Sequence, residues 1–211
     1  NFLGLFLAIL LNNAQLKGRN LFRTIIFLPY VIAPVVIGYL FTAIYNPAQG
    51  ILNQSLRAFG MGFLAQDWLN DPNIALFSTI MTDVWRTTGF SMVIYLAGLQ
   101  AIPHELYESA EIDGANGRWK LTNVTLPLLA PSITINVVLA LIGTMKVFVM
   151  ILVLTNGGPG YATEVINTYI MSTFSLGLYG SGTAANIILS FLIIVIALPV
   201  LLFLKKREVE L

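Results

Sequence analysis

Residues 184–204 read AANIILSFLIIVIALPVLLFL, and the basic residues Lys205, Lys206 and Arg207 follow at once. A helix needs about 20 mainly apolar residues to cross the hydrocarbon core of a bilayer, and this stretch has that length. Membrane helices tolerate an internal proline, so Pro199 does not argue against a span. The stretch is therefore predicted to be a transmembrane helix.

Other apolar stretches repeat this pattern, as a partial span at 1–14 and as full spans near 22–45, 74–100 and 131–155. Only 10% of the residues are charged, against about 25% in a soluble domain. Outer-membrane strands would instead alternate over runs of about ten residues. We predict one all-α domain over residues 1–211, a polytopic bundle of about five spans. Because the chain opens inside an apolar run, we expect its first span to be truncated and the natural protein to extend further.

Basic residues orient the bundle. Eight of them fall in three segments that share one side if the spans alternate, namely Lys17, Arg19, Arg23, Arg118, Lys120, Lys205, Lys206 and Arg207. The opposite side, residues 46–73 and 156–183, carries only Arg57. The positive-inside rule places the eight-residue side in the cytoplasm.

Both external segments contain helix-breaking residues. Segment 46–73 mixes glycine and proline with apolar side chains, which indicates short helices lying at the membrane interface. The run Thr155-Asn156-Gly157-Gly158-Pro159-Gly160 is predicted to be a turn.

The loop between the third and fourth spans, residues 102–130, has an internal order of its own. Pro103 suits the first turn of a helix, and Gly114 is a natural helix stop. We predict a helix–turn–helix bounded by Pro103 and Pro127. A plain connector needs neither this length nor this order, so a docking surface is the favoured interpretation.

The loop resembles the conserved cytoplasmic loop of binding-protein-dependent ABC importer permeases, in which Glu-Ala-Ala is followed by Asp-Gly-Ala and then Leu-Pro. The matching residues here are Glu108, Ser109, Ala110, Asp113, Gly114, Ala115, Leu126 and Pro127. Ser109 departs from the usual alanine. Phe27-Leu28-Pro29-Tyr30, Trp85-Arg86-Thr87-Thr88-Gly89-Phe90 and Thr155–Pro159 are similar to the sugar-importer branch, above all to its maltose-type first permease subunit.

The resemblance implies an importer subunit in a bacterial or archaeal cytoplasmic membrane, carrying an oligosaccharide or related polyol. It implies that the loop is a coupling helix held by an ATPase, with a second homologous permease, two ATP-binding subunits and an external solute-binding protein as partners. ATP and magnesium would bind the ATPase subunits, because this chain has no phosphate-binding loop and no cofactor or enzyme activity of its own. No nucleic-acid partner is expected.

Charged residues also lie inside two predicted spans: Asp83 and Arg86 in the third and Lys146 in the fourth. Each costs at least about 2.5 kcal/mol at the bilayer centre unless paired or hydrated. Asp83 and Arg86 are three apart and can pair, either as a structural ion pair or as polar groups that face a solute; Lys146 is assigned a structural role. The resemblance places solute-contact positions at Tyr30, Pro34, Asp83, Arg86, Thr87, Phe90, Thr144 and Val147, and only Tyr30 keeps the residue type found there.

Other function classes fit less well. A secondary transporter or channel that uses Asp83, Arg86 and Lys146 as an ion relay is the alternative, although no internal repeat supports it. With no cysteine and a single histidine, His104, no metal site or catalytic set is expected.

Overall fold

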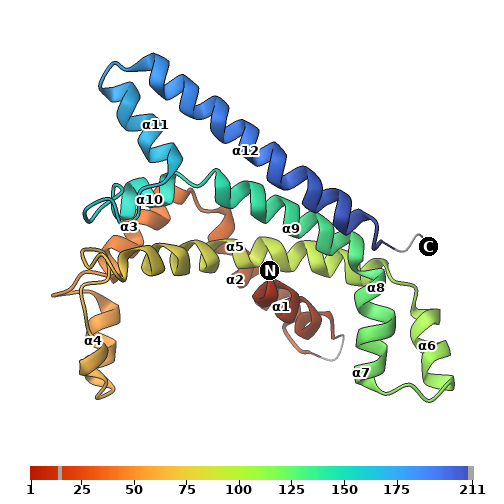
Figure 1. Cartoon of the computed structure of the whole chain (residues 1–211). Coiled ribbons are helices and arrows are strands. Elements are labelled where there is room, and N and C mark those ends of the chain that lie inside the picture. Colours follow the sequence, from red (N-terminus) through yellow and green to blue (C-terminus); the bar gives the residue numbers. More distant parts are fainter. Residues whose placement is uncertain (14–15, 209–211) are drawn as a thin grey trace. The chain divides into compact units, whose positions relative to one another are not determined.

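The computed structural model describes residues 1–13 and 16–208, and this part of the chain is helical without any strand (Figure 1). The all-α prediction is confirmed. The α-helices are α1 (Phe2–Asn12), α2 (Arg19–Val31), α3 (Pro34–Ile44), α4 (Ile51–Ala58), α5 (Ala75–Ala101), α6 (His104–Ile112), α7 (Gly117–Lys120), α8 (Leu126–Leu128), α9 (Ala130–Met145), α10 (Val149–Leu154), α11 (Ile166–Ser175) and α12 (Tyr179–Lys205). A 3-10 helix, η1 (Gly62–Leu64), and a π-helix, η2 (Leu121–Thr125), complete the set.

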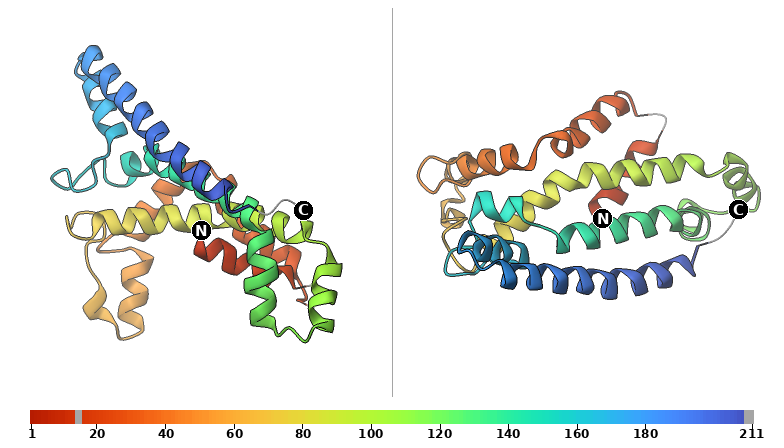
Figure 2. Two further views of the ribbon diagram at one scale, coloured as in Figure 1. Left: turned by 45° about the vertical axis from the view of Figure 1, so that its right-hand side comes forward. Right: turned by 90° about the horizontal axis from the view of Figure 1, so that it is seen from above.

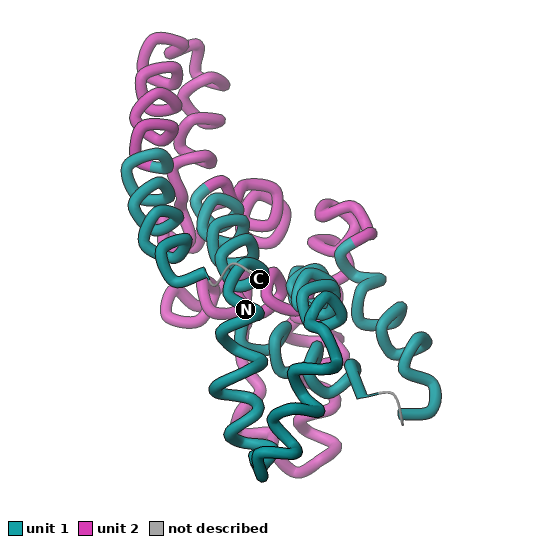
Figure 3. The backbone as a smooth tube through the Cα atoms, turned by 90° about the vertical axis from the view of Figure 1, so that its right-hand side faces the viewer, with its two compact units in different colours: residues 1–30, 87–145, 193–211 teal, residues 31–86, 146–192 magenta. Residues whose placement is uncertain are grey.

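The chain divides into two compact units, coloured separately in Figure 3. Unit 1 contains residues 1–30, 87–145 and the chain from 193 onward; unit 2 contains residues 31–86 and 146–192. Each unit has a hydrophobic core of its own.

The core of unit 1 forms where α1, the second half of α5 and the start of α9 meet. Its buried members are Ala8, Leu11, Met92, Tyr95, Leu96, Leu99, Ile102 and Leu129. Small residues let the helices approach: a Cβ on Gly98 would lie 2.7 Å from Leu129 Cδ1 and 2.9 Å from Ser132 Cβ. The Arg23 guanidinium donates to the Leu11 carbonyl over 2.7 Å and so satisfies an open acceptor at the end of α1.

The core of unit 2 is centred on α3 and α10. Ile37, Met150 and Leu154 are buried together. The end of α3 is tied to α5 by hydrogen bonds, since the Tyr45 hydroxyl donates to the Ser78 carbonyl and accepts from the Thr82 hydroxyl. These contacts fix the first turns of α5 within the unit.

Two predicted spans are wrong as continuous helices. The span at 22–45 is interrupted at residues 32–33, and α3 starts afresh at Pro34, which has no N–H to continue the ladder. The span at 131–155 is broken between Met145 and Val149. The Asn167 side chain donates to the Val147 carbonyl at 3.1 Å, which satisfies an acceptor that the break leaves open.

The other predicted spans agree better with the observed helices. Helix α5 matches the span at 74–100, and α12 begins earlier than the expected 184. Helix α1 covers the partial span at 1–14 up to Asn12, while residue 14 lies outside the described residues. By length and apolar content, α12 is the one uninterrupted described helix able to cross a bilayer; counting two bent helix pairs as spans raises the number to three. The expected total of about five also includes α1, which is short, and α5, whose first half is rich in polar side chains.

The two segments that the sequence predicts to be external have the expected local structure, with one addition. Helices α4 and η1 confirm short helices within 46–73, and residues 155–160 form a turn in which Asn156 and Gly157 have φ of 51° and 84°. Helix α11 was not predicted, because its mixture of polar and apolar residues is too short to be recognised as a span.

Candidate functional site

The loop predicted to dock a partner is a helical hairpin in unit 1, here named the 103–128 hairpin. Its first arm, α6, ends in a Schellman motif: the Gly114 N–H donates to the Glu111 carbonyl at 3.0 Å and the Ala115 N–H to the Ala110 carbonyl at 2.9 Å. Gly114 has φ +78°. This conformation is unstrained for glycine and strained for most other residues. The predicted helix stop at Gly114 is therefore confirmed, and it turns the chain into the second arm.

The second arm runs through α7, η2 and α8. The Asn116 side chain accepts the Trp119 N–H at 2.9 Å and so caps α7. In η2 the helix widens, and the Leu126 N–H reaches back to the Leu121 carbonyl. After Pro127 the chain bends by 64° into α9. The predicted helix–turn–helix is confirmed, and its second arm continues into a predicted membrane segment.

Two side-chain hydrogen bonds hold the arms together. Near the turn, Lys120 Nζ donates to Glu111 Oε1 at 2.6 Å, and this bond, together with the lysine charge, lowers the pKa of Glu111 below its ordinary value. At the base, the Tyr107 hydroxyl lies 3.1 Å from Thr125 Oγ1, and the Tyr107 ring packs against the unit 1 core. The hairpin is thus braced at both ends and joined to the core at its base.

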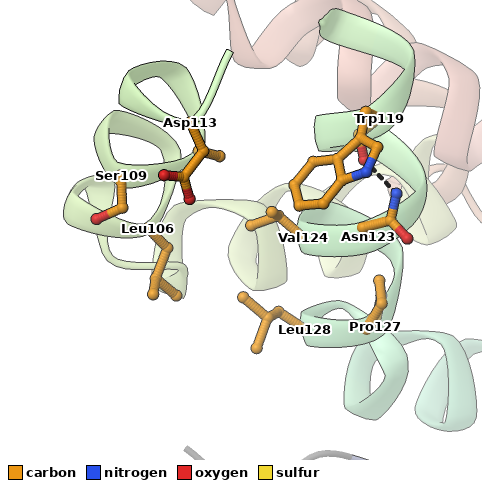
Figure 4. Close-up of a pocket in the computed structure, with 9 residues that line it drawn as sticks. Leu106, Ser109, Asp113, Trp119, Asn123, Val124, Pro127 and Leu128 are labelled. Atoms are coloured by element: carbon orange, nitrogen blue, oxygen red, sulfur yellow. Dashed lines mark hydrogen bonds between the residues drawn. The ribbon is translucent and has the colours of Figure 1, made fainter. Parts of the chain in front are cut away.

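A pocket of about 440 Å³ lies between the arms (Figure 4). Its walls are mostly apolar, and the lining residues are Leu106, Ser109, Ala110, Asp113, Trp119, Asn123, Val124, Pro127 and Leu128. On the second arm the Asn123 side chain donates to the Trp119 carbonyl at 3.1 Å. Three of the predicted coupling residues, Ser109, Ala110 and Asp113, line the pocket.

The six predicted coupling residues lie at the end of α6 and in the turn. Glu108, Ser109, Asp113 and Gly114 are exposed and Ala115 is partly buried, whereas Ala110 is only 5% exposed. Ala110 therefore packs within the hairpin, and the other five positions form the surface that a partner would meet. Their role in coupling stays a prediction.

The predicted solute-path residues are divided between the units: Tyr30, Thr87, Phe90 and Thr144 belong to unit 1, and Asp83, Arg86 and Val147 to unit 2. In unit 1 the Tyr30 and Phe90 rings stack with centroids 4.4 Å apart and an interplanar angle of 15°. In unit 2 Arg86 donates to Asp83 Oδ1 through Nε at 3.1 Å and Nη2 at 2.9 Å, so the predicted pairing is confirmed. The solute path itself stays a prediction.

Lys146 lies in the break between α9 and α10 and not inside a helix. It is exposed and makes no ion pair with any described residue. The charge that the sequence placed within a span therefore stands at a helix end, where backbone carbonyls are open.

The sequence analysis did not predict the hydrogen bonds between Tyr107 and Thr125 and between Lys120 and Glu111. A signal was present, because the partners of each pair lie at equal or nearly equal distances on either side of the turn at Asn116. Within the described part of the chain no group of three or more His, Cys, Asp or Glu residues is placed to hold a metal ion.

Comparison with known proteins adds independent findings. The model of the family described as "Binding-protein-dependent transport system inner membrane component" matches residues 1–207. The trehalose/maltose transport system permease protein MalF of Thermococcus litoralis is 39% identical over 192 residues, which cover 91% of this chain and 64% of that protein. The chain thus spans less than two thirds of the length of this relative.

Solved structures show the same likeness. A bacterial ABC transporter involved in the import of the acidic polysaccharide alginate has a chain that is 31% identical and superposes with a TM-score of 0.86, covering 97% of this chain and 72% of that one. A second structure, a bacterial alginate ABC transporter in complex with an alginate pentasaccharide-bound periplasmic protein, gives a TM-score of 0.78 at 31% identity, over 97% of this chain and 70% of that one.

Proposed function

This chain belongs to the family of binding-protein-dependent transport system inner membrane components, and from that premise we propose that it is the membrane-spanning permease subunit of an ATP-driven carbohydrate importer. The solute class is supported by the trehalose/maltose permease and by the alginate importer, which are both named for carbohydrates. An oligosaccharide or a related polyol is the proposed cargo.

The braced hairpin is the observation that carries the proposed mechanism. We propose that ATP binding closes two partner ATPases and that the 103–128 hairpin, gripped at Glu108–Ala115, moves with them. Because Glu111–Lys120 and Tyr107–Thr125 link the arms, the hairpin transmits that movement as one body. Tyr107 delivers it to the core where α1, α5 and α9 meet, and the bundle alternates between inward and outward access.

The remaining parts of the complex follow from the same proposal. A second, homologous permease completes the translocation path, and an external binding protein delivers the solute. ATP and magnesium bind on the ATPase subunits, and this chain contributes no catalytic residue. The 103–128 hairpin and the chain end after Lys205 face the cytoplasm, in agreement with the eight basic residues on that side.

We also propose that the solute meets the stacked rings of Tyr30 and Phe90 and the Asp83–Arg86 pair. An aromatic face suits the apolar face of a sugar ring, and a charged pair offers charge-assisted hydrogen bonds to hydroxyl groups. Thr87, Thr144 and Val147 complete the proposed path. An ion relay through Asp83 has no observation in its favour, since Arg86 holds that carboxylate.

Substitution of Gly114 tests the coupling role. No atom lies within 4 Å of a Cβ built on Gly114, so the isolated subunit has room for a side chain there. Asparagine tolerates positive φ, whereas leucine does not. If the ATPase packs against this turn, Gly114→Asn and Gly114→Leu should both reduce co-purification of the ATPase, although each variant still inserts into the membrane.

The control is Gly117→Asn, a glycine with equally open surroundings on the second arm. Retention of the ATPase with ATP-dependent uptake at the wild-type level in Gly114→Leu would overturn the coupling proposal. Calorimetric binding of a panel of oligosaccharides and polyols to the cognate binding protein would identify the cargo, and binding of none of them would refute the solute class.

A further inference from the structure

The segment that joins α3 to α5 in unit 2 forms a second hairpin, here named the 46–68 hairpin. Helix α4 is its first arm, residues 59–61 are its tip, and η1 begins its return. Between Asn46 and Gln66 the only charged residue is Arg57. Such a segment has few groups with which to hold water at its surface.

One buried side chain locks this hairpin. Asn53 is 1% exposed and makes hydrogen bonds with both of its polar atoms. Its Nδ2 donates to the carbonyls of Pro47 and Gln66, and its Oδ1 accepts from the Gln66 N–H and from the Trp68 indole N–H at 2.8 Å. The shape of the hairpin is thereby fixed, so the side chains that it exposes are held outward by the fold.

Several large apolar side chains lie at the surface of this hairpin. Ile51 at the start of α4 and Phe59 at the tip are 67% and 78% exposed, and Phe63 on η1 is 84% exposed. Met61 and Leu64 extend this surface at the tip. Arg57 is turned away from Phe59, because positions two apart on a helix are separated by about 200°. Gln54, three residues after Ile51 and four before Ala58, is exposed on their side of α4. Ile51 and Ala58 on α4 are therefore uncovered, as are the large apolar side chains that follow the helix, whereas Leu52 and Leu56 are partly buried.

The place of the hairpin indicates what covers that face. Helix α4 runs across the direction of the first turns of α5, as Figure 1 and the left view of Figure 2 show. Since α5 is a predicted membrane span, a helix that crosses its direction lies along the bilayer surface. Tyr45 and Trp68 stand at the base of the hairpin with ring centroids 6.2 Å apart, and these residue types gather where membrane meets water.

We propose that the 46–68 hairpin is an interfacial anchor whose apolar face, Ile51, Ala58, Phe59, Phe63 and Leu64, is immersed in the outer leaflet of the lipid bilayer. The surface protrudes, carries no acidic residue to match a basic partner, and has Arg57 on the other side of α4, where it reaches lipid phosphates or water. The anchor would hold the external end of α5 at a constant depth while other parts of the bundle move. This inference does not depend on which solute is carried.

Collision measurements on spin labels test the proposal. The chain contains no cysteine, so single substitutions give unique labels. The full-length subunit, assembled with its partners, is labelled at Ile51→Cys, Ala58→Cys, Phe59→Cys or Phe63→Cys and placed in nanodiscs of phosphatidylethanolamine and phosphatidylglycerol. Arg57→Cys is the matched control, an exposed position on the side of the same helix that is turned away from Phe59. Collision rates are measured with oxygen, which concentrates in lipid, and with a water-soluble nickel chelate.

On the anchor surface oxygen collisions should exceed nickel collisions several-fold, and at position 57 the order should reverse. Nickel-dominated collisions at 59 and 63 would show a surface in water and refute the anchor. Low rates for both reagents at these positions would show a protein interface and refute it equally. Ala58→Cys changes little volume, so it keeps the test valid if a phenylalanine variant fails to assemble.

Discussion

A hydrogen bond of 3.1 Å between the Tyr107 hydroxyl and Thr125 Oγ1 joins the two arms of the 103–128 hairpin at its base. Deleting a single oxygen atom removes this bond. Tyr107→Phe deletes the phenolic oxygen and leaves the ring against the unit 1 core. Thr125 keeps a partner, because its hydroxyl also donates to the Lys120 carbonyl at 3.3 Å. The expected loss is therefore that of one hydrogen bond, about 1 kcal/mol.

Thr125→Val should cost more. It removes the same bond, removes the bond to the Lys120 carbonyl, and leaves the Tyr107 hydroxyl without this partner, for a total of about 1–3 kcal/mol. If the two side chains bond to each other, the double variant should cost about 1 kcal/mol less than the sum of the single variants.

Hydrogen exchange of the α6 amides, followed by mass spectrometry in nanodiscs, measures these effects. Since about 1.4 kcal/mol is a tenfold change in an equilibrium constant, Tyr107→Phe should accelerate exchange about fivefold where the arms open locally. Tyr161→Phe, an exposed tyrosine in unit 2, is the control and should change nothing. Strict additivity of Tyr107→Phe and Thr125→Val would refute the brace.

Three further predictions concern charge, packing and burial. Lys120 lowers the pKa of Glu111 below its ordinary value, so the pair stabilises the hairpin above the ordinary pKa and loses its effect as the pH falls through the lowered pKa; in Lys120→Met the pKa of the Glu111 carboxyl, followed by NMR, should move back toward the ordinary value. Gly98→Leu collides with the start of α9 and should cost about 1–3 kcal/mol, seen as a lower melting temperature, whereas Gly143→Leu, with open surroundings, should not. Asn53→Leu leaves buried polar groups without partners at about 1–3 kcal/mol each, so chymotrypsin should cut the 46–68 hairpin faster than in wild type; equal cutting rates would contradict the locking role.

Prediction from the sequence succeeded where a local pattern carries the physics. Gly114 ends α6 because glycine takes φ +78° without strain, and the residues around it suffice to indicate that stop. Asp83 and Arg86 pair because three residues bring side chains to one face of a helix. Prediction failed at the breaks after Val31 and Met145, since apolar content measures length and composition but does not register where a helix stops inside lipid.

The sequence by itself determined the all-helical fold class, the unequal distribution of Lys and Arg between the two sides of the bundle, the turn at Gly114 and the resemblance of the loop to a permease family. Each of these can be read from the residues themselves, without knowing which segments are in contact. Only the tertiary structure decided that Tyr107 meets Thr125, that Asn53 is the buried centre of the 46–68 hairpin, and that Ala110 faces inward. These contacts join residues on different segments, and their existence depends on how the turns and packed glycines bring those segments together. The stretch 184–204 illustrates the division, since its apolar run fixes a helix but says nothing of which neighbours that helix contacts.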